Sequence, residues 1–63
     1  MYYVTNREGN YIGFDTKKGE WAIVAGKDKA TPFIDREKVN TFINVMQKVL
    51  YTRLYMRADK NSY

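Results

Sequence analysis

The 63-residue chain contains no cysteine and no histidine. Without cysteine it cannot form a disulfide, an iron–sulfur cluster or a thiolate zinc site. Without histidine it also lacks the commonest metal ligand and the commonest general base. Its seven carboxylates lie mostly in predicted turns and at predicted helix ends, where structural roles account for them. We therefore expect no metal, no cofactor and no enzyme activity.

Long hydrophobic runs are absent as well. No stretch approaches the roughly 20 apolar residues that span a bilayer, and the N-terminus does not have the pattern of a signal peptide. We expect a cytoplasmic protein with no membrane partner. Hydrophobic residues make up 44% of the chain and aromatic residues 16%, which favours one small folded domain over a disordered chain.

The chain has one proline and four glycines, and neither residue type occurs after residue 32. Beyond that point apolar residues recur every three or four positions, which predicts one long helix over about 35–58. Asp35 is its expected N-cap, and residues 59–63 are expected to fray. The predicted apolar stripe consists of Val39, Phe42, Ile43, Met46, Val49, Leu50 and Leu54.

Residues 2–34 have the pattern of a small antiparallel sheet. Turn signals at Gly9-Asn10, Gly19 and Gly26 separate segments rich in aromatic and β-branched residues. We predict strands over 2–5, 11–14 and 21–25, and a short edge strand over 31–34 that is limited by Pro32. The expected fold class is α+β: a three- to four-stranded antiparallel β-meander followed by one long C-terminal helix.

Alternation along each strand predicts which side chains face the helix. The third strand leaves two alternatives: either Ala22 and Val24 face inward, or Trp21, Ile23 and Ala25 do. We favour Trp21 and Ile23 because they remove more apolar surface from water. The other side chains expected to face the helix are those of Tyr2, Val4, Ile12 and Phe14.

The predicted helix is longer than the predicted strands. About 24 helical residues span roughly 36 Å, whereas a strand of six residues spans roughly 20 Å. The helix should therefore extend beyond the sheet from about residue 49. Tyrosine, methionine and arginine are enriched in protein interfaces, so we expect this extension to form a homodimer or a partner contact through Tyr51, Arg53, Leu54, Tyr55, Met56 and Arg57.

A second candidate site is the sheet face turned away from the helix. Aromatic side chains on an open sheet can stack single-stranded bases while basic neighbours neutralise phosphates. Tyr3 and Tyr11 are equally explained as a cross-strand pair that stabilises the sheet. The candidate nucleic-acid contacts are Tyr3, Arg7, Tyr11, Lys17 and Lys18.

The order of motifs over residues 2 to 46 resembles small proteins encoded by phages and mobile elements. It consists of a Tyr-Tyr-Val strand, a Gly-Asn turn into Tyr-Ile-Gly-Phe, then Trp21, an Ala30-to-Phe33 segment and a charged helix start at Asp35. The resemblance implies a host-takeover protein, such as an anti-CRISPR protein, that binds a bacterial protein or ribonucleoprotein complex. A net charge of +4 disfavours mimicry of nucleic acid.

The expected function is therefore stoichiometric binding. The leading hypothesis is a phage-type, anti-CRISPR-like inhibitor of a bacterial defence or nucleic-acid-handling complex, located in the cytoplasm of the host cell. The alternative is a protein that binds single-stranded nucleic acid through sheet aromatics and basic side chains.

Overall fold

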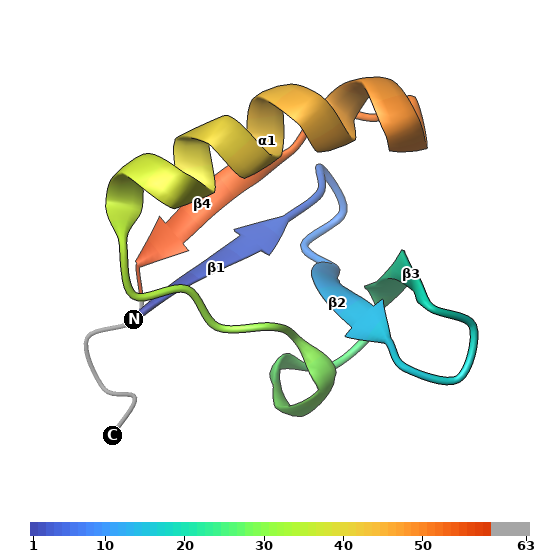
Figure 1. The fold of residues 1–63 in the computed structure, drawn as a ribbon. Helices are drawn as coiled ribbons and strands as arrows, with labels where there is room; N and C mark the ends of the chain where they lie inside the picture. Colours follow the sequence, from blue (N-terminus) through green and yellow to red (C-terminus); the bar gives the residue numbers. More distant parts are fainter. Residues whose placement is uncertain (59–63) are drawn as a thin grey trace.

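The computed structural model describes residues 1–58 as an α+β fold (Figure 1). Four strands form one antiparallel sheet in the order β3-β2-β1-β4, and a helix crosses one face. The fold class predicted from the sequence is confirmed. The fraying predicted for 59–63 concerns residues outside the described part. In chain order the elements are β1 (Tyr2–Thr5), β2 (Tyr11–Asp15), β3 (Glu20–Val24), the 3-10 helix η1 (Lys27–Lys29), α1 (Arg36–Leu50) and β4 (Tyr55–Ala58).

The first two turns form where the sequence predicts them. Gly9 and Gly19 have φ values of 84° and 68°, a left-handed conformation that glycine adopts without a steric penalty. In the first turn, the Asn6 side chain also accepts hydrogen bonds from the backbone N–H groups of Glu8 and Asn10, at 3.1 and 2.9 Å. These local interactions stabilise the turns between β1 and β2 and between β2 and β3.

The helix is shorter than predicted. It begins after the N-cap Asp35, as expected, but ends at Leu50, because Tyr51 takes the left-handed conformation with φ 53° and ψ 42°. The chain then reverses, and β4 pairs antiparallel with β1, with Met56 opposite Val4. The prediction of a helix to about residue 58 was wrong, because short apolar patterns do not distinguish a helix from a strand.

Two interactions hold the reversed segment in place. Leu54 is only 4% exposed and belongs to the hydrophobic core. Its backbone N–H donates a hydrogen bond to the side-chain oxygen of Gln47 on α1, at 3.1 Å. Leu54 has the spacing of the helical stripe, yet it reaches the core from the connection before β4.

The predicted edge strand over 31–34 has a different position. Phe33 exchanges two backbone hydrogen bonds of 2.8 Å with Tyr2, and the N–H of Thr31 donates to the carbonyl of Ile12. The segment therefore lies between β1 and β2 where these strands diverge, as the backbone in Figure 1 shows. The sheet edge beside β1 is occupied by β4 instead.

The core lies between α1 and the β1–β4 half of the sheet. α1 packs mainly on β1 and β4. The buried core side chains are those of Val4, Ile12, Val39, Met46 and Leu54, and Ile12 is contributed by the neighbouring β2. Within residues 1–58, no helix has the length and apolar character needed to cross a membrane.

Candidate functional site

The helix covers only part of the sheet. Gln47, on one flank of α1, reaches toward β4 through its bond to Leu54, while Phe42, on the other flank, contacts Trp21 of β3. A four-stranded sheet is about 15 Å wide, and one packed helix occupies about 8–10 Å of that width. Over β3, the rings of Phe42 and Phe33 pack on Trp21. Beyond these rings, part of the helix side of β2 and β3 is not covered by α1.

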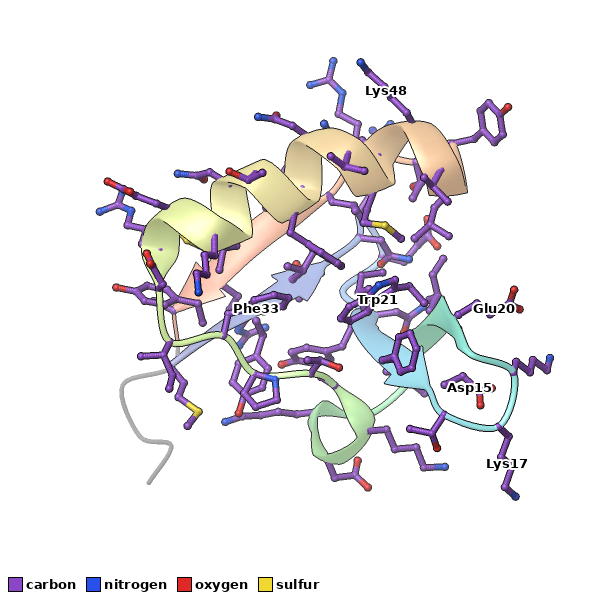
Figure 2. All side chains as sticks on the ribbon, viewed as in Figure 1. Asp15, Lys17, Glu20, Trp21, Phe33 and Lys48 are labelled. Carbon is purple, nitrogen blue, oxygen red and sulfur yellow. The ribbon has the colours of Figure 1, made fainter. Side chains whose placement is uncertain are left out.

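Two apolar side chains are exposed on the half of the sheet that α1 leaves open. Phe14 lies opposite Trp21, and Ile23 lies opposite Ile12. Because directly opposed residues point to the same face, all four are on the helix side. Phe14 is 44% exposed and Ile23 47% exposed, whereas Ile12 is fully buried. The inward orientation predicted for Trp21 is confirmed by its contact with Phe42. Figure 2 shows Trp21 on the side of the sheet that faces α1.

The flank of α1 beside this open half is apolar as well. Val45 and Val49 follow Phe42 by three and seven residues, so they lie on the same side of the helix. They are 56% and 59% exposed. Valine is a weak helix former, so its use at two exposed helical positions has no local advantage. We call the surface formed by Phe14, Trp21, Ile23, Val45 and Val49 the uncovered face.

Exposed lysines and acidic side chains lie together at the β2–β3 turn and at the start of α1. Lys38 is exposed one turn before Phe42 on the same flank of α1, and both line a shallow hollow at the start of the helix. Lys17 and Lys18 are exposed in the β2–β3 turn, where their backbone N–H groups donate to the carboxylate of Asp15. Figure 2 shows Lys17 extending from this end of the hairpin.

The opposite face of the sheet, which we call the outer face, gains two side chains from β4. Tyr55 lies opposite Thr5 and Arg57 lies opposite Tyr3. On the other side of β1, Thr5 is opposite Tyr11. The structure thus places two of the six predicted interface residues beside two of the predicted nucleic-acid contacts, Tyr3 and Tyr11.

Tyr3 is less accessible than an open sheet face requires. Its ring meets the ring of Tyr11 edge-to-face, with centroids 6.0 Å apart, and the ammonium of Lys27 lies 5.3 Å from the Tyr3 centroid. η1 packs against the backbone of Gly13, where a Cβ would collide with the Lys29 carbonyl oxygen. Tyr3 is consequently only 8% exposed, whereas Tyr55 is 45% exposed.

The remaining predicted nucleic-acid contacts lie at opposite ends of β2. Arg7 is in the β1–β2 turn, at the start of β2, and Lys17 and Lys18 follow the end of β2. The structure brings Tyr3 and Tyr11 together but does not bring these three cations together.

The predicted helical interface does not exist as one surface, because its residues lie beyond the end of α1. Tyr51 is 93% exposed at the helix end, and Leu54 is buried. Arg53 is exposed in the connection, and Met56 packs against the core. The homodimer was predicted to form through helical residues beyond residue 50, and these residues are not helical in the structure. A partner contact by any of these side chains stays a prediction.

Sequence reasoning assigned Phe14 and Ile23 to the buried helix side. Their orientation was right, but their exposure depends on where α1 lies across the sheet. The available signal was Val45, an apolar residue that lies outside the predicted stripe.

Among residues 1–58, no cluster of three or more histidine, cysteine or acidic side chains could hold a metal ion. No protein-family model, no curated protein and no solved structure matches the chain. The fold and its two faces are therefore the basis for a functional proposal.

Proposed function

We propose that this protein acts without catalysis, by stoichiometric binding of another protein to the uncovered face. One observation supports the proposal most directly: α1 leaves part of the helix side of β2 and β3 uncovered, and four apolar side chains are exposed there and on the adjoining flank of α1. Contiguous exposed apolar surface is uncommon on monomeric proteins and commonly marks an interaction site. Aromatic side chains at its centre are typical of interface hot spots.

The narrower proposal concerns the partner and rests on the resemblance of residues 2 to 46 to phage-encoded proteins. Under this proposal, the protein is a phage-type, anti-CRISPR-like inhibitor that binds a bacterial defence or nucleic-acid-handling complex in the host cytoplasm. The net charge of +4 would complement an acidic protein surface. The uncovered face replaces the C-terminal helix as the proposed contact.

Photo-cross-linking from two exposed aromatic positions tests the proposal. Benzoylphenylalanine is placed either at Phe14, on the uncovered face, or at Tyr51, which is more exposed but lies beyond the helix end. After irradiation in cells that naturally make the protein, we expect a discrete protein adduct from Phe14 and none of that mass from Tyr51. The adduct should disappear when Ile23→Ser is added. No adduct from Phe14, or the same adducts from both positions, would contradict the proposal.

A second candidate function is binding of single-stranded nucleic acid to the outer face. It is favoured by the position of β4, which adds Tyr55 and Arg57 to the face that already contains Tyr11. An exposed tyrosine beside an arginine can stack a base and neutralise its phosphate. A salt titration with an oligonucleotide, described in the Discussion, tests this function separately.

A further inference from the structure

The strand β3 forms one edge of the sheet. In the order β3-β2-β1-β4 it has a strand neighbour on one side only, and among the described elements it packs mainly on β2. Proteins commonly protect such edges with charged side chains or proline. β4, at the other edge, contains Arg57. β3 contains no proline, and its only charged residue is the first, Glu20. The β3 edge is therefore open to pairing with another strand.

The hydrogen bonds of β2 show which backbone groups of β3 point to the free edge. The carbonyl of Ile12 accepts from the N–H of Thr31 at 3.2 Å, and the N–H of Phe14 donates to the Thr31 hydroxyl at 3.0 Å. These groups point away from β3. In an antiparallel pair, opposed residues are either bonded to each other or both turned away. Ile12 is opposite Ile23, and Phe14 is opposite Trp21. The N–H and C=O groups of Trp21 and Ile23 therefore point to the free edge.

This edge is complementary to a second copy of itself. When two β3 strands lie antiparallel about a two-fold axis at Ala22, all five residues of each strand have a partner. The outward groups of Trp21 then meet those of Ile23 in the second copy, and each such pair exchanges two hydrogen bonds. The neighbouring registers that keep outward groups opposed leave two residues of each strand without a partner in the other β3. The register centred on Ala22 therefore uses the whole strand.

The side chains favour the same register. On the helix side, Trp21 would lie opposite Ile23 of the second copy, and pairs of an aromatic and a β-branched side chain stabilise sheets. Ile23 is 47% exposed in the single chain, so it is accessible for this contact. On the outer face, the small Ala22 would face its own copy, and Glu20 would face Val24. No like charges meet within the paired strands, although each chain has a net charge of +4.

We infer that this protein forms a homodimer in which the two β3 strands pair antiparallel and join two four-stranded sheets into one. The assembly is closed, because each copy uses its β3 edge once and β4 forms both outer edges. Directly opposed residues share a face, so the two helices lie on the same side and the two uncovered faces adjoin. The helix-side surface of Ile23 stays open to solvent. The dimer does not depend on the proposed function.

Sedimentation equilibrium of the purified protein tests for the dimer, over roughly 10 µM to 1 mM, where a small interface associates reversibly. We expect a monomer–dimer equilibrium that salt does not weaken, because both chains are positively charged and no ion pair joins the strands. In hydrogen exchange by NMR, the amides of Trp21 and Ile23 should exchange more slowly as the concentration rises. The amide of Ala22, which points to β2, is the control and should change little.

Two lysine substitutions test the register. Ala22→Lys places two like charges directly opposite each other at the axis and should weaken the dimer about fivefold. Val24→Lys adds the same charge opposite Glu20 of the second copy and should strengthen the dimer several-fold. Both positions line a shallow hollow on the outer face, which leaves space for a longer side chain. Circular dichroism checks that each variant folds.

A charge reversal at the axis tests whether the occupant is a second copy. Ala22→Glu should also weaken its own dimer about fivefold. An equal mixture of the Ala22→Glu and Ala22→Lys chains should form a mixed dimer that is more stable than the dimer of either variant. If one of these variants does not fold, Val24→Lys and the amide exchange still decide the result.

Three results would overturn the inference. The first is a monomer at every concentration. The second is a dimer that Ala22→Lys and Val24→Lys affect equally. The third is a dimer in which the Trp21 and Ile23 amides exchange as fast as in the dilute protein, because the contact would then lie on another surface. The cross-linked adduct from Phe14 tests the proposed function separately, so each can fail without the other.

Discussion

Trp21 on β3 packs edge-to-face against Phe42 on α1, with ring centroids 4.6 Å apart and ring planes at 66°. The ring of Phe33 packs against both of these rings. Its centroid lies 6.3 Å from that of Trp21 and 5.0 Å from that of Phe42. The three rings connect the β2–β3 hairpin to α1 near the middle of the helix. Beyond Phe42, the same helix flank continues with Val45 and Val49, which remain exposed.

The aromatic cluster should contribute strongly to stability. Phe42→Ala should lower the free energy of unfolding by about 3 kcal/mol, because it removes a large apolar side chain from between Trp21 and Phe33. Urea unfolding followed by circular dichroism measures the change. Val45→Ala on the same flank is the control and should change the value by less than about 0.5 kcal/mol. Equal effects of the two substitutions would contradict the packing described.

The left-handed conformation at Tyr51 predicts a stabilising substitution. Tyr51→Gly should raise the free energy of unfolding by roughly 0.5–1 kcal/mol, because glycine adopts this conformation without strain. In a small domain, such a change shifts the melting temperature by a few degrees. If the helix continued through residue 51, the same substitution would lower stability by about 1 kcal/mol instead. The sign of the shift therefore tests where α1 ends.

The hydrogen bond from Leu54 to Gln47 should hold β4 against the sheet. Gln47→Ala removes the acceptor of the Leu54 N–H, and we expect a loss of about 1.5 kcal/mol. In hydrogen exchange measured by NMR, the substitution should accelerate exchange of the β4 amides more than exchange of the β2 amides, each relative to the unsubstituted protein. Asn44→Ala removes an exposed amide from the same helix and should leave exchange in β4 unchanged. Uniform acceleration across the sheet would argue against a specific role of Gln47.

If the outer face binds single-stranded nucleic acid, substitutions at Tyr55 and Arg57 should change the affinity for an oligonucleotide and its dependence on salt. With a mixed-sequence oligonucleotide, Tyr55→Ala should weaken binding about tenfold through lost stacking. Arg57→Ala should reduce the slope of log affinity against log salt by about 0.7, the contribution of one phosphate contact. Tyr51→Ala is the control for the loss of an exposed tyrosine. Absence of binding at low salt would eliminate this function.

The parts of the fold that were predicted correctly depend on local signals. Gly9 and Gly19 mark turns by the backbone conformations they allow, and Asp35 marks the start of α1 by its capping side chain. The orientation of Trp21 followed from alternation along the strand. Each of these features needs only a few neighbouring residues.

The errors arose where tertiary contacts decide the structure. Leu54 has the spacing of a helical stripe, but Tyr51 ends the helix without the glycine that usually marks such an end. β4 exists because it pairs with β1, which lies some 50 positions earlier in the sequence. This reversal rearranged the predicted interface residues and placed Tyr55 and Arg57 on the outer face.

The exposure of Phe14 and Ile23 could not be predicted either. Both were assigned to the helix side, and both are there. How much of that side a helix covers depends on its crossing position over the sheet, which no local pattern specifies.

The most direct test of the uncovered face measures how accessible its methyl groups are in the free protein. In methyl NMR with a soluble paramagnetic agent, we expect strong relaxation of Ile23 and Val49 and protection of Ile12 and Val39, which are fully buried. The two pairs are matched in residue type, so the comparison depends on position alone. If Ile23 and Val49 were as protected as Ile12 and Val39, the face would already be covered within the free protein, and the proposed binding site would not exist.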